Sequence, residues 1–210
     1  MTRDWWPWLA LAGLGMYHGL NPAMGWLFAV ALGLNRRSRA TVLCSLVSIA
    51  LGHALAAALV ATGLAIAGSM VDFWPLRTTS GIALLGWAFY HALYSRTHRV
   101  RVGMQTGSAG LVLWSFLMAG THGAGLMMIP ALMRVCLAGD PAPRMTGPNP
   151  ALISLAAVGL HTLTMLVSAG AVAIVVYEWI GIAFLRRGWV NLDRVWTAAL
   201  FASGFVLVAL

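Results

Sequence analysis

Apolar residues along this chain form long continuous runs, and polar or charged residues gather in the short segments between them. A helix needs about 20 mostly apolar residues to cross the hydrocarbon core of a membrane. Six runs reach that length, namely 8–34, 41–68, 76–95, 109–134, 150–177 and 190–210. The pattern therefore predicts an all-α integral membrane protein with six transmembrane helices.

The composition of the chain is that of a membrane protein. Of its 210 residues, 60% are hydrophobic and 9% are charged, whereas soluble domains are roughly 45–50% apolar and 25% charged. The net charge of +8 comes from arginine, since all 13 basic residues are Arg. They lie in short loops, where they meet lipid phosphates, and no nucleic-acid-binding motif accompanies them. We therefore expect a lipid bilayer as the partner of this chain, and no nucleic acid.

The arginines are distributed unevenly over the loops. If the loop NRRSRA, residues 35–40, is cytoplasmic, nine arginines lie on the cytoplasmic side and four lie outside. Cytoplasmic loops of membrane proteins carry the excess of basic residues. The sequence thus predicts a multi-pass protein of the bacterial inner (plasma) membrane with both termini outside, and it leaves a homo-oligomer open.

Short motifs around four histidines repeat between the two halves of the chain. The motif MYHG at His18 is echoed by GTHG at His122, and LGHAL at His53 is echoed by GLHTL at His161. A unit of three helices is odd, so a second copy enters the membrane from the opposite side, as in the inverted repeats of secondary transporters. We expect one membrane domain built from two three-helix repeats. The predicted repeats are residues 1–104 and 105–210.

The same four histidines lie about 10 to 13 residues from the nearest predicted helix start, which places them near the middle of the membrane. Ionisable groups at this depth usually face the bundle interior and pair with each other, a ligand or an ion. The five acidic residues fall at helix ends or in loops. Without a buried counter-charge these imidazoles are expected to stay neutral, and neutral imidazole binds metals. The alternative is packing, with each ring hydrogen-bonded to a neighbouring helix. The candidate metal ligands are His18, His53, His122 and His161.

Asn21 and Pro22 follow His18 by about one helical turn. Proline has no N–H, so we expect Pro22 to free the carbonyl of His18, either as an extra ligand or as a hinge. Pro130 would break the helix in the second half in the same way. The alternative is an ordinary proline kink that serves packing.

Methionines add a second type of soft ligand. Imidazole with thioether favours Cu(I), whereas imidazole with amide or carbonyl oxygen suits Ni, Co or Zn. Methionine is also common packing material in helical cores. His91, at the cytoplasmic end of the run 76–95, is a candidate for the mouth of a pathway. The supporting methionines are Met24, Met127, Met128 and Met165.

The segment GLNPAMGWLFAVALGLNRRSRATVLCSLVSIALGHALAAAL, residues 19–59, resembles the opening of the lysine-exporter (LysE) superfamily. The resemblance is carried by Asn21 and Pro22, by the turn GLNRRSRA and by Gly52. It implies six helices in two inverted units and membership among exporters of amino acids, nickel, cobalt or related metals. The chain lacks the Gly-Pro-Asn order of amino-acid exporters, and the His-rich loop and intramembrane aspartates of nickel and cobalt exporters.

These observations predict a membrane transporter that moves a transition-metal cation (Ni, Co, Zn or Cu) as substrate or bound ion through the histidine site. An enzyme is not expected, because no nucleophile–base dyad or acidic pair is predicted to be buried. The alternatives are an amino-acid or small-metabolite exporter of the same fold, a membrane-embedded metal or haem enzyme subunit, and a structural subunit. The metal, the direction and the energy coupling of transport stay open at this point.

Overall fold

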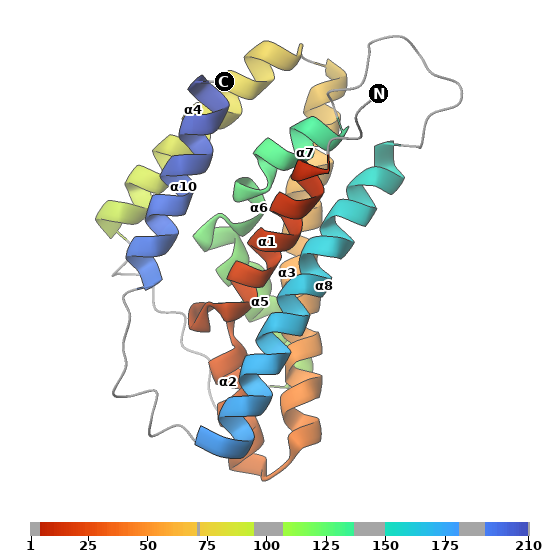
Figure 1. The fold of residues 1–210 in the computed structure, drawn as a ribbon, viewed down its shortest axis with the longest axis vertical. Coiled ribbons are helices and arrows are strands. Elements are labelled where there is room, and N and C mark those ends of the chain that lie inside the picture. The colour runs from red at the N-terminus through yellow and green to blue at the C-terminus, as the bar shows by residue number, and fades with distance from the viewer. Residues whose placement is uncertain (1–4, 71, 95–106, 137–149, 181–191, 210) are drawn as a thin grey trace.

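The computed structural model describes residues 5–70, 72–94, 107–136, 150–180 and 192–209 (Figure 1). The described residues form helices and turns, without a strand among them, so the predicted all-α character is confirmed. In chain order the elements are α1 (Trp6–Leu20), the 3-10 turn η1 (Pro22–Met24), α2 (Trp26–Arg36), α3 (Arg39–Met70), α4 (Phe73–Tyr94), α5 (Ser108–His122), α6 (Ala124–Met127), α7 (Ile129–Cys136), α8 (Pro150–Val175), the π-helical turn η2 (Val176–Ile180) and α10 (Leu192–Ala209).

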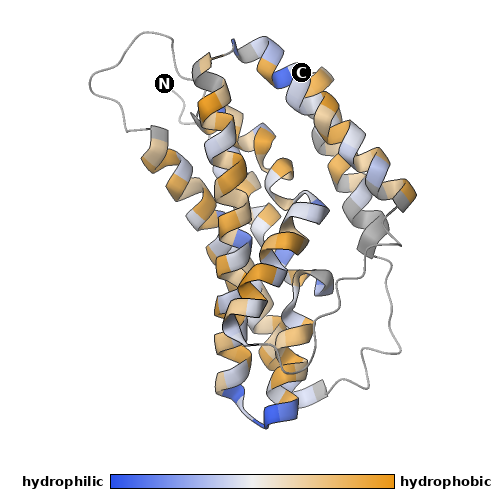
Figure 2. Ribbon diagram, turned by 180° about the vertical axis from the view of Figure 1, so that it is seen from behind, coloured by the Kyte–Doolittle hydropathy of each residue, from blue (hydrophilic) through white to orange (hydrophobic). Residues whose placement is uncertain are grey.

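Two helical stretches, Arg39–Ala67 and Ala151–Trp179, are long and apolar enough to cross a membrane, with 29 residues each. Figure 2 shows mostly hydrophobic residues along these helices and hydrophilic ones at the turn between α2 and α3. The predicted runs 8–34 and 109–134 do not form single helices, because each is interrupted. Six transmembrane helices therefore stay a prediction.

The interruption in the first half follows from its sequence. Pro22 has no N–H to donate to the carbonyl of His18, so the regular helix α1 ends at Leu20. The Asn21 N–H donates instead to the carbonyls of Tyr17 and His18, at 3.2 Å each. The prediction that Pro22 frees the His18 carbonyl is therefore wrong. Gly25 then adopts a φ of 110°, a left-handed conformation that glycine adopts at little cost, before α2 begins.

The second half is interrupted at two points. Helix α5 ends at His122, and Gly123 adopts a left-handed φ of 70° before the short helix α6. A second interruption at Met128 precedes α7, and Pro130 lies in the first turn of α7, where a missing N–H is tolerated. The predicted break near Pro130 is thus present, and Gly123 adds a break directly after His122.

The helices pack in a pattern that relates the two halves. Helix α1 packs against α8, and α5 packs against α3. The long helices α3 and α8 contact each other, and α4 lies beside α10 at one side of the molecule (Figure 1). In the predicted repeat, α1 corresponds to α5, α3 corresponds to α8, and α4 corresponds to α10. Exchanging the two halves therefore turns the α1–α8 contact into the α5–α3 contact, whereas the α3–α8 and α4–α10 contacts stay the same. The arrangement is compatible with the predicted inverted repeat, which itself stays a prediction.

Candidate metal centre

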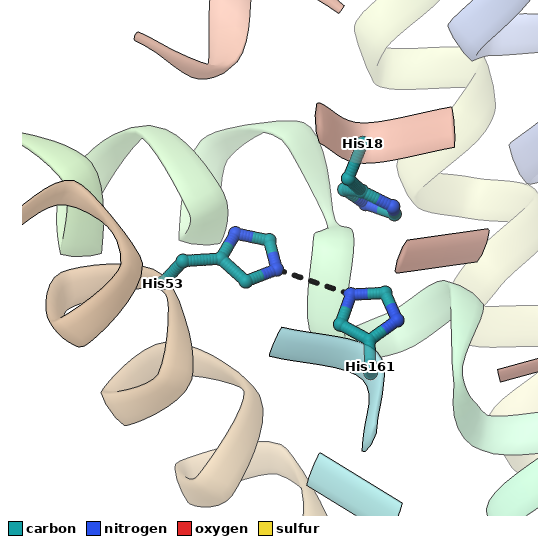
Figure 3. Close-up of side chains that lie close together, drawn as sticks. All are labelled: His18, His53 and His161. Carbon is teal, nitrogen blue, oxygen red and sulfur yellow. Dashed lines mark hydrogen bonds between the residues drawn. The ribbon is translucent and has the colours of Figure 1, made fainter. Parts of the chain in front are cut away.

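Three histidines from three helices converge in the interior. His18 lies near the end of α1, His53 in the middle of α3 and His161 in the middle of α8, and their side chains point toward one another (Figure 3). Each residue offers one ring nitrogen, and these nitrogens lie within 4.8 Å of one another. The exposed fractions are 0%, 1% and 0%. We call these three residues the histidine triad.

Backbone carbonyls of α1 orient two of the three rings. The His18 Nδ1–H donates to the Leu14 carbonyl at 2.6 Å, and the His161 Nδ1–H donates to the Leu11 carbonyl at 3.1 Å. A carbonyl only accepts hydrogen bonds, so Nδ1 carries the hydrogen in both rings. In a neutral ring the lone pair then lies on Nε2. Such an outer contact, which fixes the orientation and tautomer of a ring, is typical of histidines that bind metals.

The hydrogen bond between His53 and His161 assigns the third ring. Their Nε2 atoms lie 3.2 Å apart (Figure 3). Because the His161 Nε2 accepts, the His53 Nε2–H is the donor. A cation held by all three Nε2 atoms would replace this bond, and the His53 proton would then move to Nδ1. Of the three rings, His53 is thus the one that would change its tautomer when the triad binds a cation.

Small residues bring α1 close enough to α8 for these contacts. A Cβ on Gly15 would fall within 3 Å of the Thr164 hydroxyl and of the His161 carbonyl oxygen. A Cβ on Gly19 would fall within 3 Å of the Met165 carbonyl. Glycine at these two positions lets the two backbones touch, which places His18 beside His161 with ring centroids 4.9 Å apart.

His122, the fourth predicted ligand, is not a member of the triad. It is the last residue of α5, is half-buried, and its Nδ1–H donates to the Met118 carbonyl at 2.9 Å. This contact to the carbonyl four residues earlier is the one that His18 makes.

The predicted supporting residues lie around the interruption of α1 and in the apolar core. Asn21 is 2% exposed and directly follows the end of α1, and Pro22 is half-buried in η1. His91 lies in α4, and its side chain is outside the described ones. The supporting methionines are all buried: Met24, Met127, Met128 and Met165.

Two contacts at the triad were not predicted from the sequence. The Leu14 carbonyl could have been found, because it lies four residues before His18 in the same helix. The Leu11 carbonyl had no such signal, since it is 150 residues away from His161. Which backbone carbonyl lies beside a ring depends on helix packing, and the side chain of the residue that carries the carbonyl gives no indication of it.

The described acidic side chains lie away from the triad. Asp72 is exposed, and Glu178 is exposed and pairs with Arg39 at 3.6 Å, beside the turn between α2 and α3. Among the described side chains, then, the buried ligand set is three imidazoles without a carboxylate. Such a set binds soft or borderline metal cations.

No family model matches the chain, and no curated protein or solved structure matches it. The assignment of a function therefore depends on the residues of the site.

Proposed function

We propose that this protein is a membrane transporter of a transition-metal cation, and that the histidine triad binds the cation as substrate. The observation that carries the proposal is the convergence of three fully buried imidazoles from three helices, with ligand nitrogens within 4.8 Å of one another. Two imidazole nitrogens bound to one cation, with bonds of about 2.0–2.1 Å, are separated by roughly 3.3–3.6 Å. The separation of 3.2 Å between the Nε2 atoms of His53 and His161 is close to this value.

The surroundings of the triad favour a transported ion over a structural one. Structural zinc sites are closed by four protein ligands, whereas the triad provides three. Transporter sites are typically built beside interrupted helices near the repeat interface. Here α1 ends two residues after His18, and α5 ends at His122. The resemblance of residues 19–59 to the LysE superfamily supports the same proposal.

Transport can be tested with the full chain in liposomes that contain a metal-sensitive dye. We expect wild-type protein to carry a transition-metal cation across the bilayer, and the His53→Ala variant to reduce the flux to that of empty liposomes. Leu55→Ala, an exposed position on the same helix, is the matched control and should transport normally. Wild-type flux in His53→Ala would show that the cation does not pass through the triad, and a wild type without metal flux would favour the amino-acid or metabolite exporter instead.

The proposed orientation places the turn between α2 and α3 in the cytoplasm of a bacterial cell and both termini outside. Asn35 is exposed at this turn. In a variant without Cys44 and Cys136, we expect Asn35→Cys to react with a membrane-impermeant maleimide only after the cells are permeabilised, because of the arginine asymmetry. Labelling of Asn35→Cys in intact cells would show that the protein has the opposite orientation.

A further inference from the structure

We infer that the cation bound by the triad is monovalent and soft, of the Cu(I) class, and that it passes next to a thioether position formed by Met24 and Met165. This inference rests on the proposed function and narrows its substrate class. It rests on the charge of the site, on the number and type of ligands, and on the small cavity lined by Gly19, Met24 and Met165.

The charge of the site separates monovalent from divalent cations. The electrostatic cost of moving an ion from water into a low-dielectric interior rises with the square of its charge, so a divalent ion costs about four times as much as a monovalent one. Carboxylate or thiolate ligands compensate the charge of a buried divalent cation better than neutral imidazoles do. The acidic residues whose side chains the structure describes, Asp72 and Glu178, are exposed, and the triad ligands are imidazoles. This environment stabilises a single positive charge far better than two.

The geometry of the triad fits an ion that needs few ligands. The three ring centroids form a nearly equilateral triangle, with separations of 5.2, 4.9 and 5.3 Å. Cu(I) is satisfied by two or three ligands in linear or trigonal arrangements. Zinc takes four in a tetrahedron, and octahedral ions need more. Three buried nitrogens therefore complete a shell for Cu(I) and leave the shell of the divalent ions incomplete.

Two buried methionines line one small cavity that begins next to His18 in the chain. Met24 and Met165 line a small cavity of about 10 Å³ together with Gly19, the residue that follows His18. Met165 lies one helical turn after His161 on α8. The other lining residues are Trp26, Leu46, Ile49, Leu166 and Ala169, so the methionine sulfurs are the soft ligand atoms among the lining side chains. Thioether sulfur selects Cu(I), and it does not add charge.

The metal preference can be measured on the purified full chain in detergent under anaerobic conditions. Cu(I) is titrated in competition with a chromogenic Cu(I) chelator, and Zn(II), Ni(II) and Co(II) are measured separately by equilibrium dialysis. We expect one Cu(I) per chain, an affinity for Cu(I) at least about 100-fold above that for each divalent ion, and displacement of Cu(I) by Ag(I), which has the same charge and softness. The His53→Ala, His161→Ala double variant should lose Cu(I) while retaining a monodisperse elution profile.

The outcomes separate this inference from the proposed function. Tighter binding of a divalent ion at the triad would overturn the inference and leave the metal transporter intact. Binding of neither class of ion would overturn both.

For the thioether position, we expect the Met24→Leu, Met165→Leu double variant to bind Cu(I) at the triad but to transport it more slowly in liposomes. Met16→Leu, an exposed methionine on α1, is the control. Equal Cu(I) flux in the Met24→Leu, Met165→Leu variant and in the Met16→Leu control would show that Met24 and Met165 are not part of the pathway.

Discussion

The His53→Ala, His161→Ala double variant is expected to lose at least about 100-fold in affinity for the metal ion that the wild type binds. The two substitutions remove two of the three converging nitrogens and leave His18 as the one triad ligand. A single imidazole in an apolar interior cannot replace the hydration shell of a cation, because the other positions around the ion would face hydrocarbon. Metal analysis of the purified protein, followed by titration calorimetry, measures the loss.

The His122→Ala variant is the control for this experiment. His122 is the fourth predicted ligand, but its ring is not among the three that converge, so we expect its replacement to change the affinity by only a few-fold. Wild-type affinity should fall as the pH is lowered, because protons compete with the metal for the imidazole nitrogens. A loss in His122→Ala as large as in the double variant would point to the four-histidine site that the sequence predicts.

Gly15→Ala is expected to destabilise the protein by about 3 kcal/mol, a large effect for one added methyl group. The new Cβ would lie within 3 Å of the Thr164 hydroxyl and of the His161 carbonyl oxygen. A hydroxyl can rotate away, but a helix backbone carbonyl cannot, so α1 must move away from α8. We expect a lower thermal unfolding temperature in detergent and a weaker metal affinity, because the displacement separates His18 from His161.

Gly13→Ala provides the matched control two residues earlier on the same helix. A Cβ at Gly13 would meet no atom within 4 Å. We expect it to be neutral or to stabilise the protein by up to about 1 kcal/mol, since alanine is the better helix former. Removing the Thr164 hydroxyl in a Gly15→Ala, Thr164→Ala variant should not restore stability, because the His161 carbonyl remains. Equal unfolding temperatures of Gly13→Ala and Gly15→Ala would show that α1 and α8 are not in close contact.

The sequence by itself determined the all-α character and the polar exceptions within the apolar runs. Both are local properties, since hydrophobic run length and the identity of a residue need no knowledge of its neighbours in space. His18, His53 and His161 were recognised in this way, and each is fully buried. Pro22 likewise marked the position at which α1 ends, although its effect on the His18 carbonyl was predicted wrongly.

Only the tertiary structure decided which histidines meet. Like His18, His122 is followed directly by a glycine, yet it ends α5 outside the triad. The difference depends on how closely α1 approaches α8 at Gly15 and Gly19, and on the left-handed turn at Gly123. Contacts between residues 18 and 161 are set by the packing of whole helices, and the free energy of that packing is spread over many side chains. No local pattern therefore encodes which of four similar histidines share a site.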